Sequence, residues 1–72
     1  MRVERLVTMA NDIGAFFNAE PDKDQAAKSV ANHLKRYWEP RMLREIIAHF
    51  HEGGEGLDPL ALSAVGLLAK NH

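Results

Sequence analysis

The sequence of 72 residues contains no cysteine. This absence excludes disulfide bonds and thiolate metal sites, the usual supports of small secreted domains, so we expect a cytoplasmic protein. Long hydrophobic runs are lacking as well. The N-terminal stretch MRVERLVTMANDIGAFF carries charges within its apolar pattern, unlike a signal peptide, and no stretch approaches the roughly 20 apolar residues of a membrane span. We therefore expect a soluble protein.

The chain also lacks an excess charge of either sign. Its formal net charge is -1, which removes the simple electrostatic argument for binding nucleic acid. The charge is nevertheless unevenly spread. From Lys28 to Arg44 there are five Lys or Arg against one acid, Glu39, which gives +4 and leaves -5 for the remaining residues. A molecule with this dipole can orient on a partner.

What is present predicts one all-α domain. Apolar residues make up 46% of the chain and charged residues 26%, which is typical of a globular protein. Three prolines, Pro21, Pro40 and Pro59, each follow an acidic residue and divide the chain into four pieces of helical length. Apolar residues recur at helical spacing in each piece. We expect a compact bundle of about four short helices, over about residues 3–18, 23–38, 40–52 and 58–70.

Local signals mark the ends of these helices. Asp22 is a good N-cap for the second helix, with Gln25 three positions later in the pattern of a capping box. The pair Gly53-Gly54 can end the third helix, because glycine adopts a left-handed conformation without strain. The pair Asp58-Pro59 is expected to cap and begin the fourth.

The stretch HLKRYWEPRM, residues 33–42, joins the second and third helices. Tyr37 and Trp38 fall within the apolar stripe of the second helix, so we expect both in the core. Proline disfavours the α conformation in the residue before it, which predicts a bend just ahead of Pro40. Trp38, Pro40 and Met42 are therefore assigned to the structural joint that fixes the angle between these helices.

The fourth helix is apolar around most of its circumference. Leu62, Val65 and Ala69 extend its apolar face well past half of the helix surface. Three short neighbouring helices can cover little more than one side, so we infer that these three residues contact another protein chain. The alternative is a tight bundle that encloses this helix completely.

No set of residues resembles a catalytic or metal site. Glu45 and His49 share a helix face, but two ligands are too few for zinc and no cysteine completes the set. The serines have no histidine-acid pair nearby in the sequence, and the glycines of EGGEG follow a helix, whereas a phosphate loop precedes one. We expect no catalytic, cofactor-binding or metal-binding residue in this chain, and no enzymatic activity by the chain alone.

Arg41 and Arg44 lie near the start of the third helix, on its polar side. A positive charge there meets the unfavourable end of the helix dipole. Because the protein retains these unfavourable charges, we infer that they are used in another contact, such as a bidentate pair with a carboxylate of a partner. Both arginines are therefore candidate interface residues. The alternative is that both are solvated, with Glu45 as a helical neighbour of Arg41.

Two other functions compatible with these patterns are a helical nucleic-acid-binding module that reads with the third helix, and a self-associating protein that pairs the fourth helix with its own copy. Steep salt dependence of binding to generic DNA would distinguish the first.

The order of four motifs resembles a known family. LVTMANDIGAFF, HLKRYWEPRM, IIAHF and GGEGLDPL together resemble the small delta subunit of the soluble, NAD-dependent, molybdenum-containing formate dehydrogenases, from about Leu6 to Leu60. Asp12 and Glu39 depart from the expected Gln and Asp. Glu39 keeps the acid but is a poorer cap, and Asp12 should lie on the exposed side of the first helix.

The resemblance implies a non-catalytic subunit of an enzyme that oxidises formate to carbon dioxide and reduces NAD. It implies that the partner is the catalytic alpha subunit, which carries molybdenum bis-pterin guanine dinucleotide and iron-sulfur clusters, while the beta and gamma subunits carry FMN and further clusters. The delta chain itself would hold no cofactor. Its implied role is to support the stability, assembly or molybdenum-cofactor loading of the alpha subunit, and an isolated chain is expected to be able to form a homodimer.

Overall fold

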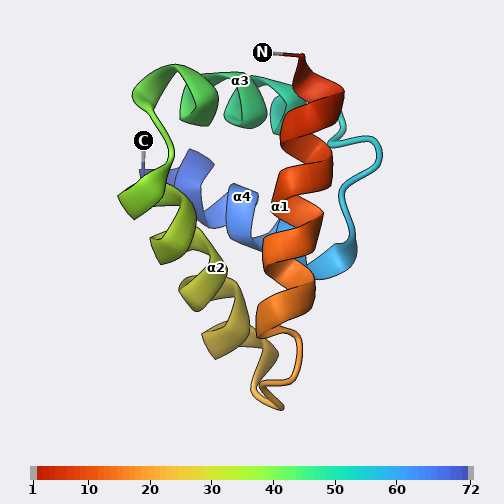
Figure 1. The fold of residues 1–72 in the computed structure, drawn as a ribbon, viewed down its shortest axis with the longest axis vertical. Coiled ribbons are helices and arrows are strands. Elements are labelled where there is room, and N and C mark those ends of the chain that lie inside the picture. The colour runs from red at the N-terminus through yellow and green to blue at the C-terminus, as the bar shows by residue number, and fades with distance from the viewer. Residues whose placement is uncertain (1, 72) are drawn as a thin grey trace.

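The computed structural model describes residues 2–71, and over that range it contains four helices and no strand. Helix α1 spans Val3–Phe17, α2 Lys23–Tyr37, α3 Pro40–His51 and α4 Pro59–Asn71 (Figure 1). The expected all-α fold is confirmed. The observed helix bounds differ from the expected ones by at most one residue. None of the helices within residues 2–71 could span a lipid bilayer.

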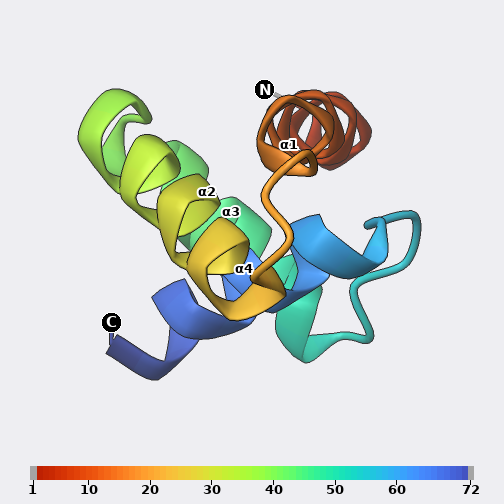
Figure 2. The same cartoon turned by 90° about the horizontal axis from the view of Figure 1, so that it is seen from below.

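Helix α4 packs against all three other helices, and α2 is its most extensive neighbour. Helices α1 and α2 diverge from the linker that joins them, while α3 crosses the far end of both (Figure 1). Seen from below, α4 runs across the lower part of the view, and α3 lies behind α2 and α4 (Figure 2). Helices of 12 to 15 residues are marginal in isolation, so their stability depends on this shared packing.

All four helices contribute fully buried side chains to one core. Leu6 of α1, Leu34 of α2, Ile46 of α3 and Val65 of α4 are among the largest of them. Where α1 crosses α4, Gly14 lies against the backbone of Ala61, and a methyl group at Gly14 would be 3.6 Å from the Ala61 amide nitrogen. Small residues at the crossing allow this close approach.

The start of α2 is capped as expected. The Asp22 carboxylate accepts hydrogen bonds from the backbone N–H groups of Asp24 and Gln25, at 3.1 and 3.2 Å. These bonds satisfy two of the donors that a helix N-terminus leaves free. On the other side of the linker, the Lys23 amine donates to the Asn18 carbonyl oxygen at 2.6 Å and so stabilises the C-terminal end of α1.

The end of α3 has the geometry of a Schellman motif. The Gly53 N–H donates to the Phe50 carbonyl at 3.1 Å, and the Gly54 N–H donates to the His49 carbonyl at 2.9 Å. Both glycines have positive φ angles, 115° and 64°. The predicted role of the glycine pair in ending the helix is confirmed.

Two elements hold the loop between α3 and α4 in place. From α1, the Asn11 side-chain amide donates to the Gly56 carbonyl at 2.9 Å, and its oxygen accepts from the Asp58 N–H at 2.8 Å. From α3, the Nε2 atom of His49 lies 2.7 Å from the Glu55 carbonyl oxygen. The loop is therefore fixed on both sides, immediately before α4 begins.

The joint between α2 and α3 bends where expected. Trp38 and Glu39 both have extended backbones, with ψ angles of 141° and 152°, and Pro40 is the first residue of α3. Trp38 is 7% exposed and belongs to the core. Met42 is half-buried against the core, and Pro40 is exposed.

The prediction that Tyr37 joins the core is wrong. Tyr37 is 65% exposed, although it follows the apolar stripe of α2. It is the last residue of α2, and the ribbon of α1 has diverged from α2 at that end (Figure 1). The Tyr37 ring is therefore left open to solvent. The helical wheel predicts the direction in which a side chain points. It does not predict how far a neighbouring helix extends alongside that side chain.

The prediction that Val65 faces another protein chain is also wrong. Val65 is fully buried within its own chain, because α4 packs against all three other helices. Leu62 and Ala69 remain half-buried. The alternative prediction, a bundle that encloses the fourth helix completely, is therefore correct for only part of α4.

Candidate protein-interaction site

Within residues 2–71, no group of three or more His, Asp or Glu side chains is placed to hold a metal ion. Glu45 and His49, the candidate ligand pair, are both half-buried on α3. The His49 ring instead contacts the loop carbonyl of Glu55, which gives this histidine a structural partner. His33 is half-buried between the rings of Phe17 and Tyr37.

The most unusual surface feature is a run of aromatic side chains, here called the aromatic patch and formed by Phe16, Phe17, His33 and Tyr37. Phe16 is 80% exposed and Tyr37 is 65% exposed. Within residues 2–71, these are the most exposed of the large hydrophobic side chains. The rings contact one another in sequence: the centroid distances are 5.1 Å from Phe16 to Phe17, 6.0 Å from Phe17 to His33 and 4.8 Å from His33 to Tyr37. The patch thus runs continuously from α1 to α2.

A cation completes the patch. The guanidinium carbon of Arg36 lies 5.7 Å from the centroid of the Tyr37 ring, within range of a cation–π interaction. Tyrosine, phenylalanine and arginine are enriched in protein interfaces, and tyrosine and arginine are also enriched among the residues that dominate binding energy. A contiguous apolar patch on a small protein commonly marks an interaction site. The patch has the composition expected of a surface that contacts protein.

This patch was not predicted, because the helical spacing of Tyr37 places that residue in the core. A usable signal was present in the pair Phe16-Phe17. Adjacent residues on a helix point about 100° apart, so a narrow core-facing stripe cannot accommodate two large neighbouring rings equally.

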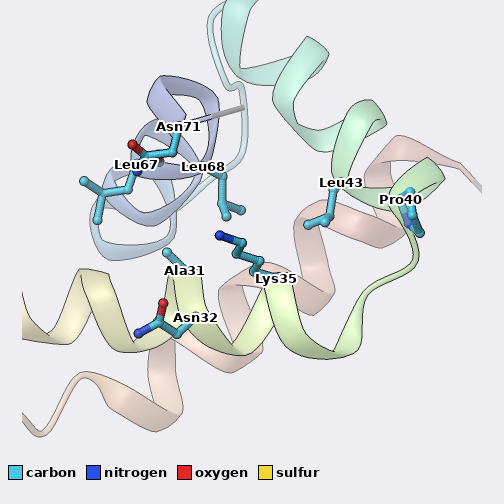
Figure 3. Close-up of a pocket in the computed structure, with 8 residues that line it drawn as sticks. All are labelled: Ala31, Asn32, Lys35, Pro40, Leu43, Leu67, Leu68 and Asn71. Atoms are coloured by element: carbon cyan, nitrogen blue, oxygen red, sulfur yellow. Dashed lines mark hydrogen bonds between the residues drawn. The ribbon is translucent and has the colours of Figure 1, made fainter.

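A second feature, here called the groove, lies on the side of α2 that faces α4. Figure 3 shows side chains of α2, α3 and α4 around it. Its volume is about 240 Å³. The lining residues are Ala31, Asn32 and Lys35 of α2, Pro40 and Leu43 of α3, and Leu67, Leu68 and Asn71 of α4.

The residues predicted to contact a partner do not form a single cluster. Arg41 and Arg44 are exposed and border a shallow hollow at the start of α3, which shares Pro40 with the groove. Leu62 and Ala69 lie on α4 outside the groove lining. The structure therefore places the two arginines beside the groove and leaves the two α4 residues apart from it.

Fold and surface together define a class: a small all-α protein with large aromatic side chains on its surface and, across residues 2–71, no group of side chains placed to hold a metal ion. The sequence matches the family of the NADH-dependent formate dehydrogenase delta subunit FdsD over residues 5–65. Because the match covers most of the 72-residue chain, the protein belongs to this family, and the resemblance found in the motifs is confirmed. Comparisons with curated proteins and with solved structures found no match. By its family, the chain is a subunit of a formate dehydrogenase complex.

Proposed function

We propose that this chain is a non-catalytic accessory subunit that docks on the catalytic alpha subunit of an NAD-dependent formate dehydrogenase. Its role there is to support the stability, assembly or molybdenum-cofactor loading of the alpha subunit. The observation that carries the proposal is the exposed aromatic patch on a chain whose family is a delta subunit. A surface of this kind is costly to leave in water and is well suited to contact with protein.

The size of the aromatic patch indicates how much it can contribute to docking. A large aromatic side chain buries roughly 150 to 250 Å², and apolar burial stabilises by about 25 cal/mol per Å². With Phe16 and Tyr37 exposed by 80% and 65%, their complete burial would contribute roughly 5 to 9 kcal/mol before association costs. Association itself costs roughly 4 to 15 kcal/mol. The patch can therefore anchor an interface but needs additional contacts around it.

Arg41, Arg44, Leu62 and Ala69 are proposed as such additional contacts. The two arginines are exposed and suited to bidentate pairing with carboxylates, and the two apolar residues are half-buried on α4. The redox centres of the complex, namely the molybdenum bis-pterin guanine dinucleotide, the iron-sulfur clusters and FMN, are assigned to the other subunits. The lack of cysteine supports this assignment for the clusters, and it supports a cytoplasmic complex.

Co-purification tests the proposal. The tagged chain is co-expressed with the other subunits, and the retained alpha subunit, its molybdenum content and formate-dependent NAD reduction are measured. We expect the wild-type chain to retain the alpha subunit and the double variant Phe16→Ser/Tyr37→Ser to retain at least tenfold less. The matched control is Asp12→Ser/Gln25→Ser, which changes two exposed residues on the same two helices. Equal retention by the two double variants would contradict docking through the patch.

The same exposed rings favour a second behaviour, pairing of the isolated chain with its own copy. In the absence of the alpha subunit, the patch can be shielded from water by the patch of another molecule. Sedimentation analysis of the isolated chain is expected to show a dimer that Phe16→Ser/Tyr37→Ser converts to a monomer. A dimer that persists in this variant would exclude the patch as the contact.

A further inference from the structure

The groove between α2, α3 and α4 has an apolar floor. Ala31, Leu43 and Leu68 line it and are nearly buried, whereas Leu67 is half-buried and Pro40 is exposed at its edge. The floor therefore belongs to the core, and the walls remain open to an incoming group. An apolar cavity of roughly 150 Å³ is enough to hold a benzene molecule. The groove, at about 240 Å³, has room for one or two large apolar side chains.

The polar part of the groove has one sign of charge. Among residues 2–71, its polar lining residues are Lys35, Asn32 and Asn71, and no lining residue of that range carries a carboxylate. The Lys35 side chain extends from α2 across the groove, with its amine pointing toward Leu68 on α4 (Figure 3). A ligand that fills the floor must therefore pass a cation at the rim. Such a ligand binds better if it carries negative charge.

The positive charge continues beyond the groove. Pro40 belongs both to the groove and to the neighbouring hollow at the start of α3, which Arg41 and Arg44 border. The segment from Lys28 to Arg44 has a charge of +4, with Glu39 as its one acid. Arginine and lysine around an apolar anchor point favour a partner that surrounds an apolar side chain with carboxylates.

From this geometry we infer that the groove binds an acidic segment of the catalytic alpha subunit, which inserts at least one leucine- or phenylalanine-sized side chain beside Asp or Glu. Lys35 and Arg41 meet the carboxylates, and Leu43, Leu67 and Leu68 receive the apolar side chain. This inference rests on the proposed function. It adds a second contact to the aromatic patch, on the other side of α2, and it specifies the chemistry of the partner segment. Two contacts on opposite sides of one helix fix the orientation of the bound subunit.

Charge reversal at the rim provides the first test, in the co-expressed complex with the tagged chain. Lys35→Glu is expected to retain at least tenfold less alpha subunit than the wild type. Arg5→Glu is the matched control, because it makes the same change of charge at an exposed position on α1 outside the groove. Retention by Lys35→Glu equal to that of Arg5→Glu would overturn the inference.

The apolar contact is tested by a second matched pair. Leu67→Gln and Leu60→Gln both alter a half-buried leucine of α4, but Leu67 lines the groove and Leu60 does not. Only Leu67→Gln is expected to weaken retention, at a similar melting temperature for both variants. Equal retention by the two would overturn the inference.

Cross-linking identifies the partner segment without altering the floor of the groove. A photoreactive amino acid replaces Asn32, which is exposed at the rim, and the cross-linked peptide of the assembled complex is identified by mass spectrometry. The expected peptide belongs to the alpha subunit and contains Leu or Phe next to Asp or Glu. A cross-link to a second copy of this chain, to nucleic acid or to a basic segment would overturn the inference, as would the absence of any cross-link in a complex that forms.

Failure of the inference and failure of the proposed function give different results. If the wild-type chain does not retain the alpha subunit, the proposed function is wrong and the inference falls with it. If the wild type and the groove variants retain it equally while Phe16→Ser/Tyr37→Ser does not, the proposed function stands and only the groove inference is overturned.

Discussion

Replacing Asn11 with alanine tests the attachment of the α3–α4 loop to α1. Asn11 is half-buried, donates to the Gly56 carbonyl at 2.9 Å and accepts from the Asp58 N–H at 2.8 Å. A hydrogen bond contributes about 0.5 to 1.5 kcal/mol net, so the two bonds together contribute about 2 kcal/mol. Alanine recovers about 0.5 kcal/mol through its better helix propensity. The expected loss in the free energy of unfolding is therefore about 1.5 kcal/mol.

Thermal unfolding followed by circular dichroism measures this loss. In a domain of this size, 1 kcal/mol shifts the melting temperature by about 4 to 8 °C, so Asn11→Ala should melt roughly 6 to 12 °C below the wild type. Asn32→Ala is the control, because Asn32 is exposed in the middle of α2 and gains the same helix propensity. The control should melt at or slightly above the wild-type temperature. If Asn11→Ala melts as high as Asn32→Ala, the two hydrogen bonds do not stabilise the fold and the reasoning is refuted.

Three further substitutions test the core and the backbone. Trp38→Ala should lower the free energy of unfolding by about 3 to 5 kcal/mol, as measured by urea titration, because Trp38 is nearly buried; an unchanged midpoint would contradict its place in the core. Gly14→Ala should raise the stability by about 0.5 to 1 kcal/mol, since the new methyl group makes an ordinary contact with Ala61 at 3.6 Å; a lower melting temperature would show that this crossing has no room. Gly54→Ala should destabilise by at least about 1 kcal/mol, because its φ angle is 64° and the methyl group would lie 2.6 Å from the Cδ1 atom of Leu62; wild-type melting would contradict this.

The helices and their ends could be predicted from the sequence because their causes are local. An acid that accepts bonds from the next turn, a proline at the first helical position and a glycine pair at a C-terminus act within a few residues. Asp22, Pro40 and Gly53 all have the predicted roles. The burial of Trp38 also followed from its place in the apolar stripe of α2.

The two wrong predictions, for Tyr37 and Val65, depend on how neighbouring helices cover these side chains in the folded protein. Tyr37 was placed in the core by its direction, but its exposure depends on where α1 diverges from α2. The apolar pattern of α4 does not reveal how many helices surround it. The sequence therefore predicts Val65 at an interface, although it is buried among the helices of its own chain. The groove could not be predicted either, because its walls come from three helices and residues as distant in sequence as Ala31 and Leu67.

The hydrogen bonds of Asn11 also restrict how this chain can change in length. They connect the MAN segment of α1 to the GLDP segment before α4, across 45 and 47 residues. An insertion or deletion between Gly53 and Asp58 would separate these partners and misplace the start of α4. The linker at residues 18–22 is held by bonds between residues close in sequence, which an inserted residue can re-form. Length differences among related chains should therefore accumulate in the linker, while the spacing from Gly53 to Asp58 stays fixed.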